Sequence, residues 1–359
     1  MDNFQISALR LINQQIISSK CNSAKSVVAL MGAMQAQDSN MVKWAIGQRW
    51  PGSVVQQIDT AIDKGEILRT HLLRPTWHYV SPDDICWLLK LTAPRIKRAM
   101  KSRDKELGLT EQIYSKCNAI IEKELSHQGH LTRDELVQLL TASKIKTDEN
   151  RASHIFMSAE LEGIICSGKQ KNKKQSFALL SERAPNPEIL NHHEALARLA
   201  QRYFMSHGPA TLQDFTWWSG LSVVEAKQAL NSVQSSFVSE TINGLVYWFA
   251  PTINSLPTDN NVCVLSAFDE FLISYKDRTA SLPKELNSKA VSNNGIFRPV
   301  LIVDGQVVGI WNRTIKGERV LIETKFLQPV HNYIKFEIEK AFAGYAAFID
   351  KKVEFKKNE

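Results

Sequence analysis

The sequence predicts an α+β fold in which tandem winged-helix units, of the helix-turn-helix class, precede a β-rich C-terminal subdomain. Two successive segments each show three amphipathic helices followed by a short β-hairpin, and strand patterns dominate after about Asn260. The length of 359 residues also exceeds what one ordinary core needs. We therefore expect a first winged-helix-like unit at 1–105, a second winged helix at 106–184, a third at 188–252 and the β-rich subdomain at 260–359.

Helical periodicity and helix-ending residues justify the first two units. The first is expected to contain helices over 4–17 and 23–34, strands at 67–68 and 76–80, and a helix that begins after Pro82. The second is expected to contain helices over 110–128, 132–140 and 150–162, then a hairpin of 164–166 and 177–180. Thr132 and Glu135 form a capping-box pattern, and Gly129 and Gly163 end the neighbouring helices. Three helices and a hairpin with a basic tip are typical of a winged helix.

The third unit repeats this order after the linker 185–187. Helices are expected over 192–207, from Pro209 and over 222–230, before a hairpin of 237–238 and 245–249. Asp134 and Asp214 stand in the second helix of the two units, which indicates an internal repeat. The C-terminal subdomain is expected to contain strands at 262–265, 298–303, 306–311 and 319–323 and a helix over 335–348.

Composition limits the class of protein. Apolar residues make up 43% and charged residues 23%, as in folded globular chains. No apolar run approaches the roughly 20 residues that cross a bilayer, so we expect a cytoplasmic, nucleoid-associated monomer without membrane contact. The five cysteines never form a C-x-x-C pair, which favours free thiols, and we expect no metal and no cofactor.

Two basic clusters predict contact with a polyphosphate partner. The net charge is +7, and the stretch 90–105 contains one acid, Asp104, while 169–174 contains none. Phosphate contacts release counterions and give salt-dependent affinity. The residues expected to bind the DNA backbone are Arg95, Lys97, Arg98, Lys101, Lys169, Lys171, Lys173 and Lys174. The alternative is a solvated helix face and a polar loop tip.

The segment Gln35-Ala36-Gln37 has the clearest chemical meaning. In a continuous helix, residues 35 and 37 would point to nearly opposite sides. The following Asp38-Ser39-Asn40 favours a departure from the helix, after which both carboxamides can face one space and hold a water molecule. The alternative is that the two amides cap the end of the helix.

The whole chain resembles the AlkZ/YcaQ-type winged-helix DNA glycosylases, a family marked by a Gln–hydrophobic–Gln motif. Gln35 and Gln37, with the small Ala36 between them, fit that motif, and the stretches 69–80, 268–278 and 305–311 are also similar. Another branch of the family carries Gln-x-Asp, and this chain follows the Gln-x-Gln branch.

The resemblance implies a monofunctional alkylpurine DNA glycosylase, a DNA-repair hydrolase whose partner is double-stranded DNA with alkylated bases. Such an enzyme would excise N-alkylated purines of the N7 type. The resemblance leaves open whether it also unhooks interstrand cross-links. An N7-alkylated purine is cationic and leaves without a strong general acid, so the enzyme must supply a positioned water and electrostatic support. Gln35 and Gln37 are the expected catalytic residues. The alternatives are a non-catalytic winged-helix DNA-binding protein, such as a transcription regulator, and a protein-interaction module.

Several residues of the family-like stretch 69–80 have two interpretations. Trp77 and His78 either line the same cleft as the glutamines, as substrate-binding residues, or are a core tryptophan and a satisfied strand histidine. Arg69 and Arg74 are either phosphate ligands or salt-bridge partners.

Two further pairs have a favoured structural interpretation. Asp269 and Glu270 resemble a carboxylate dyad, but neighbours on a strand face opposite ways, so pairing with Lys276 or Arg278 is favoured. Trp217-Trp218 is expected in the core.

Overall fold

The computed structural model describes residues 1–251 and 261–356, so the predicted junction near 252–260 lies outside the described residues. Contacts divide the chain into two compact units, and each is described by itself. Unit 1 consists of Met1–Ile58 and Leu196–Glu359, and unit 2 of Asp59–Ala195. The predicted first part, 1–105, contributes residues to both units.

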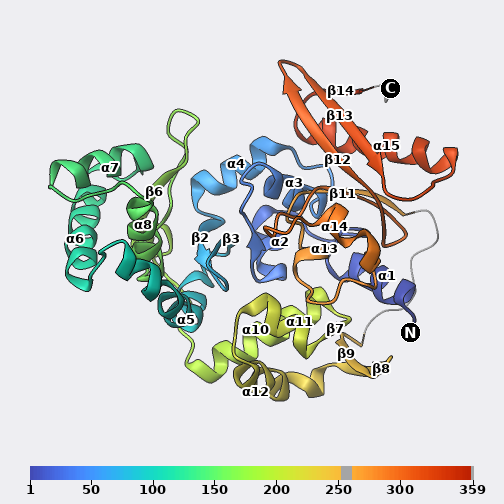
Figure 1. Ribbon diagram of the computed structural model, residues 1–359, viewed down its shortest axis with the longest axis horizontal. Helices are drawn as coiled ribbons and strands as arrows, with labels where there is room; N and C mark the ends of the chain where they lie inside the picture. The colour runs from blue at the N-terminus through green and yellow to red at the C-terminus, as the bar shows by residue number, and fades with distance from the viewer. Residues whose placement is uncertain (252–260, 357–359) are drawn as a thin grey trace. The chain divides into compact units, whose positions relative to one another are not determined.

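Unit 2 contains a β-hairpin, a long helix and a group of three helices. Its elements, with α4 beginning just before it, are α4 (Val55–Lys64), β2 (Leu68–Leu72), β3 (Thr76–Val80), α5 (Ile85–Glu106), α6 (Glu111–Gln128), β4 (Leu131–Thr132), α7 (Arg133–Ala142), α8 (Arg151–Leu161), β5 (Ile165–Ser167), β6 (Ser176–Leu179) and α9 (Leu180–Arg183). Figure 1 shows α6, α7 and α8 grouped together. The hairpin strands β2 and β3 pair antiparallel, and β6 lies between β4 and β5.

The helix ends of unit 2 follow the sequence signals. Thr132 and Glu135 form the expected capping box, and Gly163 follows α8 with a φ of 70°. The core of the group is formed by apolar residues from all three helices and from the sheet, including Ile121, Leu140 and Ile155. The expected order of three helices and a hairpin is therefore present in this part.

The helical part of unit 1 combines the N-terminal segment with a second group of helices. Its elements are α1 (Asn3–Asn13), α2 (Ala24–Met31), β1 (Met34–Gln35), α3 (Met41–Gln48), α10 (His192–His207), β7 (Ala210–Thr211), α11 (Leu212–Ser219), α12 (Val223–Val233), the 3₁₀ turn η1 (Gln234–Ser236), β8 (Val238–Ile242) and β9 (Leu245–Phe249). Strand β9 lies between β7 and β8. Thr211 forms a capping box with Asp214, so Asp214 corresponds to Glu135 rather than to Asp134. The internal repeat is aligned one residue away from the expected match.

The C-terminal part of unit 1 is built on a five-stranded sheet in the order β10-β11-β12-β13-β14. Its elements are β10 (Val262–Leu265), α13 (Glu270–Ile273), η2 (Lys284–Leu286), α14 (Asn287–Ala290), β11 (Val300–Val303), β12 (Gln306–Lys316), β13 (Arg319–Phe326), α15 (Asn332–Phe348) and β14 (Lys352–Phe355). Strand β14 pairs parallel to β13 and was not predicted, because four residues carry little periodicity. Figure 1 shows α15 beside this sheet.

The two ends of unit 1 share one core. Leu11 and Ile16 pack in the same buried cluster as Leu265, Phe271 and Val300. In α3, Gly47 lies so close to the ring of Phe348 in α15 that a Cβ atom would overlap it. Among the helices of the described ranges, none combines the length and apolar character that a membrane span needs.

Candidate functional site

The Gln35–Gln37 segment leaves the helix, as the sequence indicated. Helix α2 ends at Gly32, which has a φ of 77°, and Gln35 lies in the two-residue strand β1. The side chains differ in exposure, because Gln35 is 5% exposed whereas Gln37 is open to solvent. The buried Ala36 between them contributes to the core. The helix expected over 23–34 therefore ends three residues earlier, at Met31, since glycine permits the positive φ that ends it.

Glu270 holds the backbone of this segment. Its side chain is 2% exposed, and Oε1 accepts a hydrogen bond of 2.6 Å from the amide N–H of Gln35. Oε2 accepts hydrogen bonds from the Trp218 indole N–H, at 3.2 Å, and from the Ser274 hydroxyl. One buried carboxylate thus fixes the position of Gln35 relative to α11 and α13.

The charge state of Glu270 follows from these contacts. Burial alone would raise the pKa of Glu270, but the facing His207 and the hydrogen bonds from Ser274 and Gln35 hold that pKa at about 2. The His207 ring is fully buried, and its Nε2 lies 3.7 Å from Oε2 of Glu270. Burial lowers the pKa of His207, while Glu270 opposes that change. Glu270 is therefore ionised at neutral pH and acts as a hydrogen-bond acceptor.

The neighbouring Asp269 anchors the turn that carries Glu270. Asp269 is the N-cap of α13 and accepts a hydrogen bond from the amide of Phe271. Both of its oxygens pair with the fully buried Arg49, at 2.8 and 3.1 Å. Burial lowers the pKa of Arg49, but the Asp269 charge outweighs it and raises that pKa above its usual value. A buried bidentate pair of this kind fixes geometry more than it adds stability.

The expected pairing of Asp269 and Glu270 with Lys276 or Arg278 was wrong. The two acids begin a helical turn instead of lying on a strand, so both side chains enter the core. Lys276 and Arg278 instead contact Trp217 through their cationic groups, at 4.8 and 5.7 Å from a ring centroid. Trp217 is half-buried, whereas Trp218 belongs to the core, as expected.

In unit 2, Trp77 and His78 are neighbours on strand β3 of the β2–β3 hairpin, so their side chains point to opposite faces of it. His78 is 1% exposed, and its Nδ1 lies 3.0 Å from the carbonyl oxygen of Thr76. On the opposite face, the half-buried Trp77 contacts His71 and Arg69, with 4.4 Å between the ring centroids and 4.2 Å from the guanidinium carbon to the ring. Arg74 is half-buried at the turn of the hairpin.

This hairpin face contains a buried pair that the sequence did not reveal. His71 pairs through Nδ1 with the buried Glu160 of α8. The alternation of β2 places His71 on the same face as Arg69, and the hairpin register pairs His71 directly with Trp77 on the neighbouring strand. That register was the sequence signal from which the contact between His71 and Trp77 could have been predicted.

The basic residues are distributed over α5 and the β5–β6 loop. Arg95, Arg98 and Lys101 are exposed on α5, where Lys97 pairs with Glu162. In the loop, Lys169 and Lys173 are exposed, while acids of α7 pair with the other two lysines, as Lys171–Glu135 at 2.6 Å and Lys174–Asp134 at 2.7 Å. Helix α7 therefore supplies the acids that the loop sequence lacks, which reduces the local positive charge.

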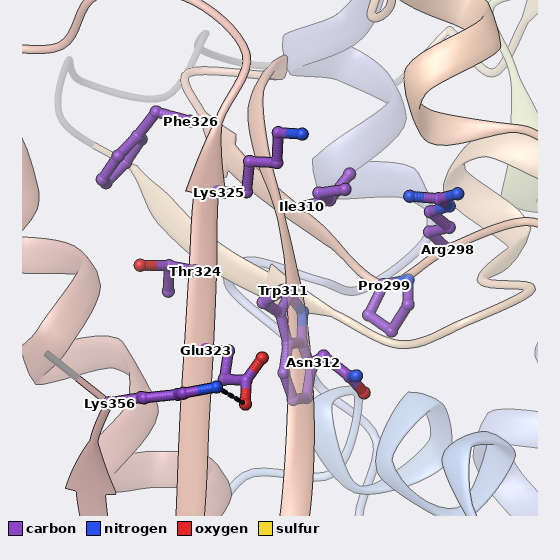
Figure 2. A pocket seen from close by; sticks show the side chains of 10 residues that line it. All are labelled: Arg298, Pro299, Ile310, Trp311, Asn312, Glu323, Thr324, Lys325, Phe326 and Lys356. Atoms are coloured by element: carbon purple, nitrogen blue, oxygen red, sulfur yellow. Dashed lines mark hydrogen bonds and ion pairs between the residues drawn. The ribbon is translucent and has the colours of Figure 1, made fainter. Parts of the chain in front are cut away.

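Unit 1 also contains an open groove along β12 and β13, beside the segment that leads into β11, that the sequence did not predict. Its volume is about 1070 Å³, and its lining includes Trp311, Arg298 and Lys325. Figure 2 shows Lys356 paired with Glu323, while Arg298 and Lys325 stand apart from this pair. The groove thus has a surplus of positive charge within the unit that contains Gln35.

Comparison with known proteins identifies the class. The family model described as AlkZ-like DNA glycosylase matches residues 28–348, which is most of the chain. The protein thus falls in a class of enzymes that act on DNA as glycosylases. Within that class it belongs to the AlkZ-like DNA glycosylase family, as the sequence resemblance indicated.

A sequence comparison and a structure comparison each find a similar protein from Streptomyces sahachiroi. The interstrand DNA cross-link repair glycosylase of Streptomyces sahachiroi is 23% identical over 86% of this chain and 86% of its own. The structure of Streptomyces sahachiroi DNA glycosylase AlkZ matches with a TM-score of 0.79 at 20% identity, over 98% of this chain and 99% of that one. The second likeness establishes the mixed α+β fold.

Proposed function

We propose that the protein hydrolyses the N-glycosidic bond of N7-alkylated purines in double-stranded DNA, with a water molecule held by Gln35 and Gln37. The observation that carries the proposal is the fixed backbone of Gln35, which the ionised Glu270 holds two residues before the exposed Gln37. A fixed backbone limits the positions that the two carboxamides reach, which is the requirement for orienting one water molecule.

Hydrolysis of the N-glycosidic bond of an N7-alkylated purine requires little beyond an oriented water molecule. Alkylation at N7 makes the purine a cationic leaving group, so departure requires no strong general acid. The sugar that remains has oxocarbenium character and captures a neutral water, which loses a proton to the solvent as the new C–O bond forms. An amide can accept a hydrogen bond from that water and direct its lone pair toward the anomeric carbon. Glu270 is a positioning residue in this scheme, because it acts through the Gln35 backbone.

The two helix groups with their three-stranded sheets support a role in DNA binding. We assign α6–α8 with β4–β6, and α10–α12 with β7–β9, as winged-helix units. The exposed cations Arg95, Arg98, Lys101, Lys169 and Lys173 contact phosphates in this proposal. The protein acts as a cytoplasmic, nucleoid-associated monomer and as a monofunctional glycosylase. The name of the Streptomyces sahachiroi relative supports interstrand cross-links as a second substrate class.

The test is base release from a duplex oligonucleotide that contains one N7-methylguanine. The wild-type protein releases the base, and the Gln35→Ala/Gln37→Ala double variant loses release while it keeps DNA binding. No release from this lesion, nor from a bulkier N7 adduct, would refute glycosylase activity and leave a non-catalytic DNA-binding protein. Release by the double variant at the wild-type rate would refute the assignment of the two glutamines.

A further inference from the structure

A cavity within unit 2 lies between the β2–β3 hairpin, α8 and β6, and it has no part in the proposed chemistry. Its volume is about 330 Å³, at the lower end of the roughly 300–1,000 Å³ of small-molecule sites. Aromatic side chains from three elements line it, namely Trp77, Phe156 and Phe177. The cavity therefore has the size and the planar walls that suit one aromatic ring system.

The walls provide stacking surfaces. Phe156 and Phe177 lie with ring centroids 5.3 Å apart, and the guanidinium of Arg69 covers Trp77 at 4.2 Å. A guanidinium stacked on an indole extends the planar surface, and nucleobases stack on aromatic rings and on arginine alike. Such stacking contributes about 1–3 kcal/mol for each base.

A buried acceptor lies in the same cavity. Glu160 is 2% exposed and its Oε2 is paired with Nδ1 of His71. A carboxylate has about four lone-pair positions, so this pairing leaves capacity for a donor from a ligand. An exocyclic amino group is the donor that matches a carboxylate beside planar walls.

An exposed cation, Arg133, is among the residues that line the cavity. The exposed Arg133 lies with its guanidinium carbon 5.7 Å from the Phe156 ring centroid, and its Nη2 donates a hydrogen bond to Ser153 at 3.3 Å. A cation beside a stacking site suits the phosphate that follows a base in a nucleic-acid strand.

From this combination we propose that the cavity receives one unstacked, amino-bearing nucleobase of a DNA strand. Phe156 and Phe177 stack with the base, Glu160 accepts a hydrogen bond from its amino group, and Arg133 contacts the adjoining phosphate. This inference rests on the proposed action on DNA, but it adds a second base-binding position, distinct from the residues assigned to hydrolysis.

Photocross-linking tests the proposal directly. A short single-stranded DNA with one 5-iodocytosine is irradiated with the full-length protein, and the linked residue is mapped by mass spectrometry. The expected links are at Trp77, Phe156 or Phe177. Ser153→Leu, which adds bulk at an exposed lining position, should remove them, whereas Ala142→Leu, at an exposed position on α7, should keep them.

The role of Glu160 has its own readout. A matched DNA with 5-iodouracil lacks the amino group, so the ratio of iodocytosine to iodouracil links should fall severalfold in Glu160→Gln. An unchanged ratio, or links that map only to residues outside the cavity, would overturn the proposal. Release of N7-methylguanine, measured on the same preparations, reports on the proposed function separately. Release without cavity links overturns only the cavity proposal, whereas cavity links with no release of N7-methylguanine or of the bulkier N7 adduct overturn only the glycosylase activity.

Discussion

Replacing Glu270 by alanine removes the acceptor that serves three buried donors, on Gln35, Trp218 and Ser274. Each buried donor left without an acceptor costs about 1–3 kcal/mol. Loss of the carboxylate also ends its own desolvation cost, so the free energy of unfolding should fall by about 3–5 kcal/mol. Proteins of this type are stable by about 5–15 kcal/mol, so this loss leaves the variant folded in the absence of denaturant unless the wild type lies at the low end of that range.

Glu270→Gln provides a graded comparison. The amide oxygen can keep the hydrogen bond to Gln35, and the Ser274 hydroxyl can rotate to accept a hydrogen bond, so only the Trp218 N–H loses its acceptor. The expected loss is about 1–3 kcal/mol. Glu318→Gln is a matched control, because the Glu318 side chain is 84% exposed.

Two measurements decide this prediction. Guanidinium unfolding gives the stability change, and single-turnover base release gives the activity of the folded protein. A displacement of about 1 Å at a reacting group lowers rates about 10²-fold, so Glu270→Ala should release base about 10²-fold more slowly while DNA affinity is retained. Stability and release equal to those of Glu318→Gln would refute the role assigned to Glu270.

Three further predictions concern pH, packing and charge. The pKa of Glu270 lies at about 2 in the folded chain against an ordinary value of 4.5, so its stabilising effect is present above pH 4.5 and is lost as the pH falls toward 2. The free energy of unfolding of the wild type should therefore decrease as the pH falls over this range, and that of Glu270→Gln should not show this decrease. Parallel curves of unfolding free energy against pH for the two proteins would contradict the prediction. Gly47→Ala should lower the free energy of unfolding by about 1–3 kcal/mol, because its Cβ displaces the ring of Phe348, and calorimetry with no shift in Tm would contradict that packing. Lys101→Ala and Lys169→Ala should each reduce the slope of log Kd against log salt by about 1, and an unchanged slope would remove that lysine from the DNA interface.

Much of the fold follows from local sequence signals. The capping boxes at Thr132 and Ser222 and the glycine after α8 are short-range features, and each ends or begins a helix where expected. The short strand β14 lacked such a signal. Its place depends on pairing with β13, which lies some way back along the chain but beside β14 in the sheet.

The site was predictable only in part. The Gln-x-Gln motif is contiguous and identified the segment, but its support comes from Glu270, which lies 235 residues further along the chain. The pairing of Arg49 with Asp269 spans 220 residues. It depends on how the C-terminal end of α3 packs against the N-terminal end of α13. Helical and strand periodicity carry no information about such contacts, so a strand was inferred for 269–270 where a buried helical turn exists.

The division of unit 1 into two distant segments has a consequence for synthesis of the protein. A ribosome adds about 5–20 residues per second, so the 235 residues between Gln35 and Glu270 take roughly 10–50 s to make. During that time the N-terminal segment has neither its carboxylate nor the strands that complete its core, while the whole of unit 2 has already emerged. A nascent chain, or one that ends before Glu270, therefore lacks the carboxylate that holds the backbone of Gln35.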